Sequence, residues 1–257
     1  MRDNGRVSLY RDDGIVLRTQ KLGEADRIVT VLTRRNGRVR AVGKGVRRTK
    51  SRFGARLEPF THVDLMLYTG RSLDVITQAE TVRAYGEPLA TDYPRYTSGT
   101  AMLETAERFT PMEKEPIIRQ FLLLVGGLRA LGERVHDPRL VLDAYLLRTL
   151  AVAGYAPALD ECAVCGTPDG ASPGDMTGSR SFAVPAGGLT CRSCRPAGAA
   201  SPAVATIALM RALLRGDWAR ADASQARHQV ECSGLVAAYV QWHLEHSIRS
   251  LRHVEHA

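Results

Sequence analysis

The sequence has no apolar run of the roughly 18 residues that a membrane-spanning helix needs. Its first residues, MRDNGRVSLYRDDG, are polar, so they do not resemble a signal peptide either. Both absences predict a cytoplasmic protein. Thiols stay reduced in that compartment, and the cysteines are therefore not expected to form disulfides.

Motifs that would carry catalysis are also missing. GRVRAVGKG resembles a phosphate-binding loop, but five residues rather than four separate Gly37 from Gly43, and Gly45 replaces the required Ser or Thr. His243 and His246 stand three apart without a third ligand nearby, so we interpret them as a surface or partly buried pair. No arrangement of a nucleophilic side chain with a general base is evident. A compact carboxylate cluster of the kind that a two-metal nuclease needs is not evident either. The sequence therefore predicts a protein that is not an enzyme.

Acidic residues are absent between Asp26 and Glu58, where basic residues are dense. Residues 1–80 carry 17 Lys and Arg against 9 Asp and Glu, so they hold the whole excess of a chain whose net charge is +8. Ordinary solvated surfaces mix both signs, and a basic field confined to one region favours a polyanionic partner, either nucleic acid or an anionic membrane surface. We predict ten DNA-binding residues that contact phosphates rather than bases: Arg34, Arg35, Arg38, Arg40, Lys44, Arg47, Arg48, Lys50, Arg52 and Arg56.

Residues 8–85 show the pattern of β-strands. GIVLRTQKL and RIVTVLT are aliphatic and β-branched, and the turns predicted at Asn36-Gly37 and Thr69-Gly70 separate further strands. About five strands in fewer than 80 residues predict a small barrel. Within the strand from Arg38 to Lys44, alternation places the basic side chains on one face of the sheet.

Helical periodicity begins near residue 88, so the chain is predicted to be an α+β protein. Asp137-Pro138 supplies an N-cap and a first-turn proline for RLVLDAYLLRTLAVA, and Gly216 ends AVATIALMRALLR. IIRQFLLLVGGLRAL and SGLVAAYVQWHLEHSIRSL predict two more helices. We interpret the apolar residues 121–124 as core, with a partner-binding groove as the alternative. Residues 166–180 are dense in Gly, Ser, Pro and Asp and are predicted to form a mobile loop.

Four of the five cysteines form two C-x2-C pairs, Cys162 with Cys165 and Cys191 with Cys194, separated by twenty-five residues. Two such knuckles can present four thiolates to Zn²⁺ at the corners of a tetrahedron. Four protein ligands leave no open position, so we predict one structural zinc ion per chain. Reduced thiols without metal, or two disulfides, are the alternatives. Cys232, alone on a predicted helix, is expected to be a small buried residue.

Two segments resemble the RecO family of bacterial recombination mediators: LGEADRIVTVLTRRNGRVRAVGKGVRRTKSRFGARLEPF and LLRTLAVAGYAPALDECAVCG. The second cysteine pair and the C-terminal helix follow in the family's order, so the resemblance covers nearly the whole chain. This sequence departs from the family pattern in two ways. The spacer between its cysteine pairs is long, and the residues MRDNGRV precede the family's expected start. The resemblance implies an N-terminal OB-fold barrel in residues 1–82, a helical body in 83–160 and 198–257, and an embedded zinc element in 161–197.

The resemblance also implies a function in DNA repair at the nucleoid. Members of the family bind single- and double-stranded DNA, anneal complementary strands and, with the partner RecR, help RecA load onto DNA coated by single-stranded-DNA-binding protein (SSB). An aromatic residue such as Phe53 or Tyr68 would support a base. Recognition of the acidic SSB tail is implied too, and Arg119, Arg129 and Arg148 are candidates for it, with arginines that only flank the core as the alternative.

Two other classes of protein stay open at this point. One is a nucleic-acid-processing enzyme that uses the barrel as an anchor. The other is a zinc-ribbon adaptor that acts only through protein contacts.

Overall fold

The computed structural model describes residues 8–48, 51, 53–169 and 180–252, with side chains up to residue 244. Lys50, Arg52 and residues 170–179 of the predicted mobile loop lie outside the described residues. The chain divides into two compact units, Met1–Val135 and His136–Ala257. No described helix is both long enough and apolar enough to cross a membrane.

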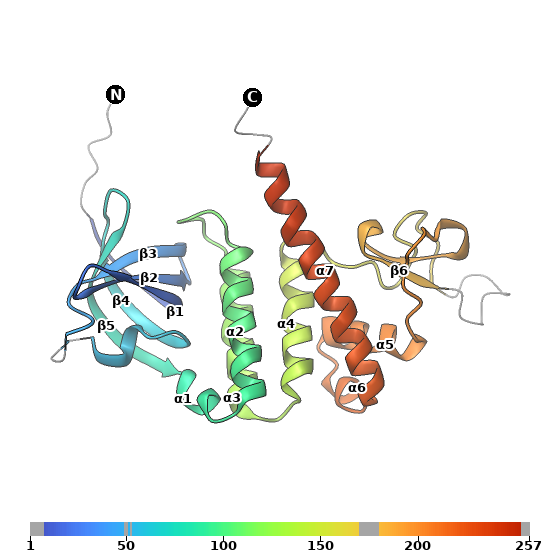
Figure 1. Ribbon diagram of the computed structural model, residues 1–257, viewed down its shortest axis with the longest axis horizontal. Helices are drawn as coiled ribbons and strands as arrows, with labels where there is room; N and C mark the ends of the chain where they lie inside the picture. The colour runs from blue at the N-terminus through green and yellow to red at the C-terminus, as the bar shows by residue number, and fades with distance from the viewer. Residues whose placement is uncertain (1–7, 49–50, 52, 170–179, 253–257) are drawn as a thin grey trace. The chain divides into compact units, whose positions relative to one another are not determined.

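The first unit contains the predicted five-stranded barrel (Figure 1). Its strands are β1 (Leu9–Leu22), β2 (Asp26–Thr33), β3 (Gly37–Gly43), β4 (Thr61–Tyr68) and β5 (Asp74–Ala84). The order around the closed barrel is β1-β2-β3-β5-β4, with β3 and β5 parallel and the other neighbours antiparallel. Long β1 pairs with both β2 and β4, and a register shift between Val16 and Arg18 bends it. This topology is that of an OB-fold.

Aliphatic side chains at alternating strand positions fill the barrel. On β3 the residues Val39 and Ala41 are buried, whereas Arg38 and Arg40 lie on the other face, as the alternation predicts. The hairpin turn predicted at Asn36-Gly37 is present, and Gly37 adopts φ 62° there, a conformation that glycine tolerates best. The strand pattern of the sequence is therefore confirmed.

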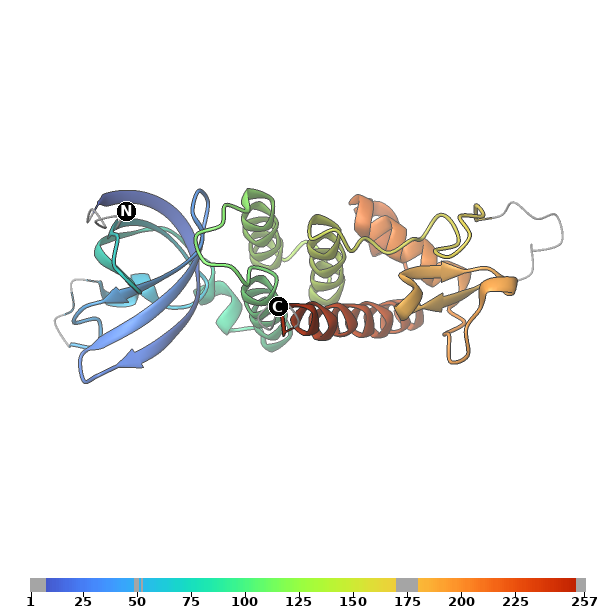
Figure 2. The same cartoon turned by 90° about the horizontal axis from the view of Figure 1, so that it is seen from above.

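Three helices belong to the same compact unit as the barrel (Figure 2). They are α1 (Gly86–Ala90), α2 (Tyr93–Arg108) and α3 (Ile118–Glu133), and a short 3-10 helix, η1 (Gly54–Leu57), precedes β4. Phe121 and Leu124 on α3 are fully buried, which confirms them as core, whereas Leu122 is 51% exposed. The grouping of residues 83–160 into one helical domain stays a prediction about which segments fold together.

In its described residues, the second unit combines four helices with a small cysteine-bearing element. The helices are α4 (Pro138–Val152), α5 (Val204–Arg215), α6 (Trp218–Asp222) and α7 (Ala226–Arg252), and the element contains β6 (Ser181–Ala183), β7 (Gly188–Thr190) and two 3-10 turns, η2 (Val184–Ala186) and η3 (Arg192–Cys194). Asp137 caps α4 by accepting a hydrogen bond from the Arg139 N–H at 2.8 Å, and Gly216 ends α5 at φ 85°. Both helix boundaries are therefore confirmed.

A buried carboxyl group, that of Asp143, lies where α4 packs on α7. Its side chain accepts a hydrogen bond from the Ser233 hydroxyl at 2.6 Å. Burial raises the pKa of Asp143 to about 7, against the opposing effects of Ser233 and of the Arg139 charge. In the unfolded chain the pKa of an aspartate is about 4. Between about pH 4 and pH 7 the folded state therefore binds more protons than the unfolded state, and the free energy of unfolding falls as the pH rises.

Replacing this residue, Asp143→Asn, is expected to remove that pH dependence. The amide carbonyl can still accept the Ser233 hydrogen bond, while no charge has to be buried. At about pH 8 the variant should be more stable by roughly 1–4 kcal/mol, and near pH 4 the two proteins should be equal. Thermal unfolding at both values measures the difference. A variant that is less stable at the higher pH would show that the ionised carboxylate stabilises the fold.

Candidate nucleic-acid interface and metal site

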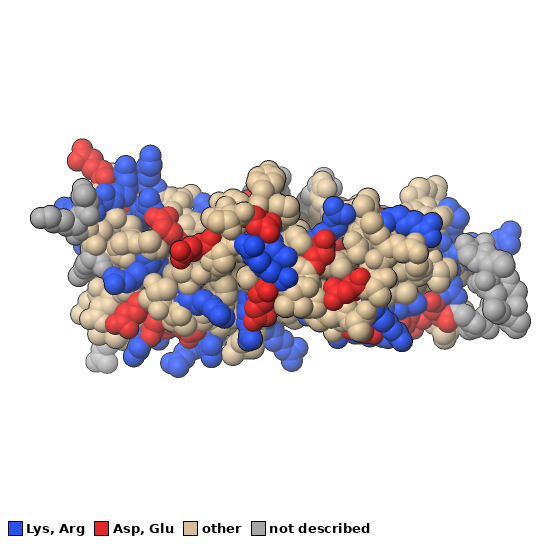
Figure 3. All heavy atoms as spheres, turned by 90° about the horizontal axis from the view of Figure 1, so that it is seen from below, with Lys and Arg blue, Asp and Glu red and all other residues tan. Residues whose placement is uncertain are grey.

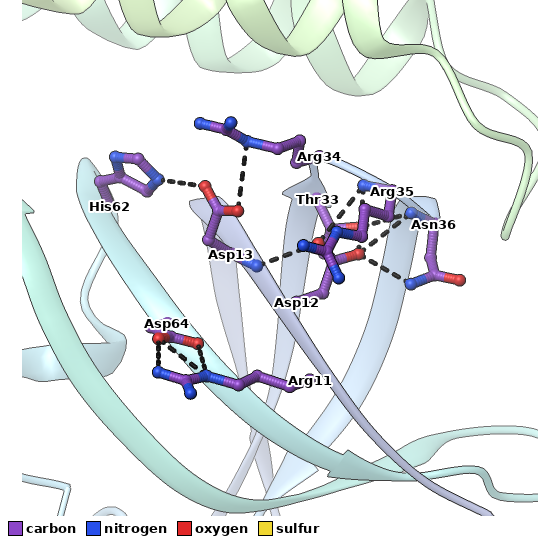
Figure 4. A network of polar contacts seen from close by, with 9 residues as sticks. All are labelled: Arg11, Asp12, Asp13, Thr33, Arg34, Arg35, Asn36, His62 and Asp64. Carbon is purple, nitrogen blue, oxygen red and sulfur yellow. Dashed lines mark hydrogen bonds and ion pairs between the residues drawn. The ribbon is translucent and has the colours of Figure 1, made fainter.

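A buried carboxylate organises the β2–β3 turn, which carries the first two predicted DNA-binding residues (Figure 4). Asp12 on β1 is 3% exposed. It accepts hydrogen bonds from the backbone N–H groups of Arg35 (3.2 Å) and Asn36 (3.0 Å) and from the Asn36 side-chain amide (2.7 Å). These bonds satisfy a charge that would otherwise be costly to bury. Arg34 and Arg35 are therefore presented by a fixed turn.

Arg34 is partly engaged within its own unit. Its Nε lies 3.2 Å from an oxygen of Asp13, and its guanidinium lies over the Phe121 ring, 5.4 Å from the centroid. Asp13 also contacts the ring nitrogen of His62 at 2.9 Å. The Arg34 side chain remains 45% exposed, so it is tethered but still accessible.

Arg38 and Arg40 meet acidic residues that lie about seventy positions further along the sequence. Arg38 Nη1 lies 3.9 Å from Glu107 on α2, and Arg38 Nη2 donates to the carbonyl oxygen of Pro111. Arg40 Nη1 lies 3.6 Å from Glu113, in the linker between α2 and α3. Their side chains are 14% and 34% exposed. Nothing local in the sequence signals these pairs, and a role of the two arginines in DNA binding stays a prediction.

The loop after β3 presents a second group of basic residues, and two of the nearby acids are already engaged. Asp26 accepts a hydrogen bond from the Gly45 N–H at 2.7 Å, and Glu58 pairs with Arg27 at 2.6 Å. Lys44, Arg47 and Arg48 are exposed and have no carboxylate partner within the described part of the chain. We call these three residues the cationic loop.

One backbone and one side-chain hydrogen bond of Arg47 hold the cationic loop against the connection between β1 and β2. The Arg47 N–H donates to the Ala25 carbonyl oxygen at 3.0 Å, and Arg47 Nη1 donates to the Gly23 carbonyl oxygen at 3.3 Å. In OB-folds this connection borders the face that takes up nucleic acids. The loop therefore holds exposed positive charge at a place suited to a phosphate backbone.

The remaining barrel candidates differ in accessibility. Arg56 is exposed in η1, and in Figure 3 basic side chains project from the barrel end with a few acidic ones between them. Phe53 is only 1% exposed, so the prediction that its ring supports a base is wrong, because the barrel core covers the ring. Tyr68, in contrast, is 42% exposed at the end of β4.

The three arginines predicted for the SSB tail lie in different surroundings. Arg119 is exposed near the start of α3, and Arg129 pairs with Glu133 one turn away at 2.6 Å. Arg148 is half-buried, and it donates two hydrogen bonds to the Leu213 carbonyl oxygen, at 3.1 and 2.8 Å. It therefore satisfies a carbonyl at the end of α5, which is a structural task.

The structure brings together the four predicted metal ligands. The Sγ atoms of Cys162, Cys165, Cys191 and Cys194 all lie within 4.8 Å of one another, and those of Cys165 and Cys191 are 3.9 Å apart. A tetrahedral zinc site with bonds of about 2.3 Å requires sulfur atoms about 3.8 Å apart. The donor set therefore fits a metal ion that prefers thiolates.

Backbone hydrogen bonds converge on one of these sulfur atoms. The N–H of Cys191 donates to the sulfur of Cys162 at 3.4 Å, and Cys165 and Val164 add backbone donors. Burial raises the pKa of the Cys162 thiol, but these donors outweigh it and lower the pKa to about 6. The neighbouring sulfurs, Cys191 first, raise the pKa of Cys194 to about 12. The cluster already favours a thiolate at one corner, and a bound cation would favour thiolates at the others.

Short backbone hydrogen bonds join the two halves of the cysteine element. The Ala163 N–H donates to the Leu189 carbonyl oxygen at 2.7 Å, and the Leu189 N–H donates to that of Ala158 at 2.8 Å. The Tyr239 hydroxyl of α7 donates to the Gly187 carbonyl oxygen at 3.2 Å. The knuckles are thus connected directly to the helical part of the second unit.

The other residues considered for metal binding lie elsewhere. The His243 ring stacks on Tyr155, with centroids 4.6 Å apart, and the side chain of His246 lies outside those that the structure describes. Cys232 is fully buried on α7, as predicted. Among the described residues, the four-cysteine cluster is the group whose ligand atoms converge for metal binding.

Two family models match most of the chain. The model described as "Recombination protein O N terminal" matches residues 7–85, which span the barrel. The model described as "Recombination protein O C terminal" matches residues 90–252, which include the helices from α2 onward and the cysteine element.

Curated relatives match over their full length. The "DNA repair protein RecO" of Thermobifida fusca (strain YX) is 69% identical over 251 residues, which cover 98% of this chain and 100% of the relative. The protein of the same name from Streptomyces griseus subsp. griseus is 59% identical over 255 residues, covering 97% and 100%. That from Frankia casuarinae is 57% identical over 251 residues, covering 98% and 100%. With an OB-fold barrel, a four-cysteine cluster and these matches along its length, the chain belongs to the RecO family of DNA repair proteins.

Proposed function

We propose that this chain is a non-catalytic recombination mediator that binds single- and double-stranded DNA and anneals complementary strands. With RecR, it helps RecA load onto single-stranded DNA that is coated by SSB. The family places the chain in DNA repair, and the observation that supports DNA binding most directly is the exposed, acid-free cationic loop beside the β1–β2 connection. The site of action is the cytoplasm, at the nucleoid.

Affinity for DNA would come mainly from the release of counterions. Each phosphate that Lys44, Arg47 or Arg48 neutralises releases a condensed cation from the strand, independently of base sequence. Tyr68, exposed at the end of β4, is the barrel aromatic residue that we expect to stack on a base. Affinity without strong sequence preference is what a general annealing protein requires.

Annealing then needs no catalytic residue. Two strands that are neutralised by basic side chains repel each other less, so complementary bases meet more often, and base pairing supplies the free energy. A structural Zn²⁺ ion held by Cys162, Cys165, Cys191 and Cys194 would stabilise the second unit and would supply no reaction chemistry, because four thiolates fill its coordination sphere.

A gel mobility-shift assay with a labelled oligonucleotide, with and without its complementary strand, tests this function. We expect retarded single strands and faster duplex formation without any nucleotide. Shortened or chemically altered DNA would instead indicate a nucleic-acid-processing enzyme. No retardation at moderate salt would favour a zinc-ribbon adaptor that acts through protein contacts.

The proposed contact with the SSB tail has its best candidate in Arg119, because Arg129 and Arg148 are engaged within the chain. We expect Arg119→Glu to weaken binding of a fluorescent tail peptide and to slow annealing of SSB-coated strands. Annealing of naked strands should stay nearly unchanged. An equal loss on naked strands would assign Arg119 to the DNA surface or to the fold. Arg129→Glu serves as the comparison on the same helix.

A further inference from the structure

The linker between α2 and α3, residues 109–117, lies along the first half of β3. In Figure 1 it is the green loop that extends from the top of α2 toward β3. The Lys114 N–H donates to the Arg38 carbonyl oxygen at 3.0 Å, and Arg38 and Glu113 form a parallel β-bridge. A side chain at Gly37 would meet the Glu115 carbonyl oxygen at 1.8 Å, so the two backbones touch. The linker thus pairs with the edge of β3 through one isolated bridge.

The barrel leaves room for the linker. Strand β5 pairs with β3 only at Ala41–Gly43, so the backbone of residues 37–40 has an open edge on that side. An open edge presents unpaired N–H and C=O groups that accept another extended segment. The linker occupies this edge, on the strand whose outer face carries Arg38 and Arg40.

One carboxylate of the linker and one of α2 face these arginines. Glu113 faces Arg40 at 3.6 Å, and Glu107, just before the linker, faces Arg38 at 3.9 Å while it holds Arg18 of β1 at 2.8 Å. The carboxylates thus stand where phosphate oxygens would stand if a strand of nucleic acid ran along β3.

One lysine anchors the linker to the barrel. Lys114 adopts φ 60°, which is uncommon for a residue other than glycine, and its Nζ lies 2.8 Å from Asp74. Asp74 is 1% exposed and also accepts hydrogen bonds from the Tyr10 hydroxyl and the Gly70 N–H. The contact between Lys114 and Asp74 is short, whereas the contacts of Glu113 with Arg40 and of Glu107 with Arg38, which come before it in the sequence, are long.

The linker and α2 leave one buried donor on each of the two arginines without a hydrogen-bond acceptor in the described chain. The Nε atoms of both Arg38 and Arg40 are buried and find no acceptor among the described residues. A buried donor without a partner is unfavourable, and a phosphate group offers several acceptor oxygens to a guanidinium group. The closed arrangement is therefore open to competition from an anionic backbone.

We propose that the linker is an internal competitor that single-stranded DNA displaces from β3. In the closed state DNA reaches the cationic loop and the other exposed basic residues of the barrel, while Arg38 and Arg40 stay paired within the chain. In the open state the linker leaves the edge of β3. Arg38 and Arg40 then bind further phosphates of the DNA strand that the cationic loop already holds. This inference rests on the proposed DNA binding and adds to it a second set of contacts that DNA must compete to reach.

Two isosteric variants in the linker provide the first test. Glu113→Gln removes the charge that faces Arg40, and Glu115→Gln removes an exposed charge with no ion pair among the described residues. Both change the net charge equally. Fluorescence anisotropy with an oligothymidine should show Glu113→Gln binding about two- to fivefold more tightly than Glu115→Gln, the range expected for one partly exposed ion pair. Equal affinities would overturn the proposal.

Hydrogen exchange at the Lys114 amide provides the second test, and the proposal requires both results. Saturating oligothymidine should speed its exchange at least about tenfold by removing its Arg38 acceptor, while amides within β2 stay protected. Unchanged or slower exchange would overturn the proposal.

A double variant, Arg47→Glu with Arg48→Glu, distinguishes a failure of the linker proposal from a failure of the proposed DNA-binding site. If it no longer binds DNA while the Glu113→Gln and Glu115→Gln variants bind alike, only the linker proposal fails. If it binds DNA normally, the proposed DNA site itself fails.

Discussion

Affinity for single-stranded DNA is expected to fall on the order of 100-fold when Arg47 and Arg48 are both replaced by glutamate. Each arginine is exposed and unopposed by a carboxylate within the described chain, so reversal removes two phosphate contacts and adds repulsion. Anisotropy titrations at several salt concentrations measure the effect. The slope of log affinity against log salt should shrink by about 0.7 for each phosphate that is no longer neutralised.

A matched control carries the same change of charge on the second unit. Arg139→Glu with Arg220→Glu alters two exposed arginines, one in the first turn of α4 and one in the last turn of α6 that pairs with Asp217, and is expected to change DNA affinity only severalfold. Circular dichroism should show both double variants folded. Equal losses in the two would mean that net charge, and not the cationic loop, governs DNA binding.

Loss of the metal and a marked loss of stability are expected when Cys162 and Cys165 are both replaced by serine. Folding brings the four sulfurs within 4.8 Å of one another, and the two serines would leave only two of the four ligands that a structural metal ion needs. A structural zinc ion contributes at least about 3 kcal/mol, which corresponds to a fall of about 10 °C in Tm for a unit of this size. Metal analysis and thermal unfolding measure the two effects.

Cys232→Ala is the control for the metal prediction, because this residue lies buried on α7 outside the cluster. It should retain one zinc ion per chain even if packing at that site loosens. The Cys162 and Cys165 variant should also lose less DNA affinity than the Arg47 and Arg48 variant. Wild-type protein purified without chelator that contains no zinc would contradict the metal assignment.

Local patterns predict several elements because each depends on residues that are close in sequence. Alternation along β3, the turn at Asn36-Gly37 and the Asp137 cap of α4 involve neighbours within a few positions. The bounds of helix α2 cannot be predicted from such a pattern. Its buried face includes Arg95, Ser98 and Thr105, and these polar residues obscure the apolar period on which such a prediction depends.

By itself, the sequence determined the strand pattern, the C-x2-C pairs and the excess of basic charge in the first third of the chain. Only the tertiary structure decided which of those charges are free. Glu107 and Glu113 reach Arg38 and Arg40 because α2 and its linker fold back on the barrel, while Arg47 and Arg48 keep their exposure. Charges that are distant in sequence interact only when folding brings them within a few ångströms, because water and salt screen them at longer range.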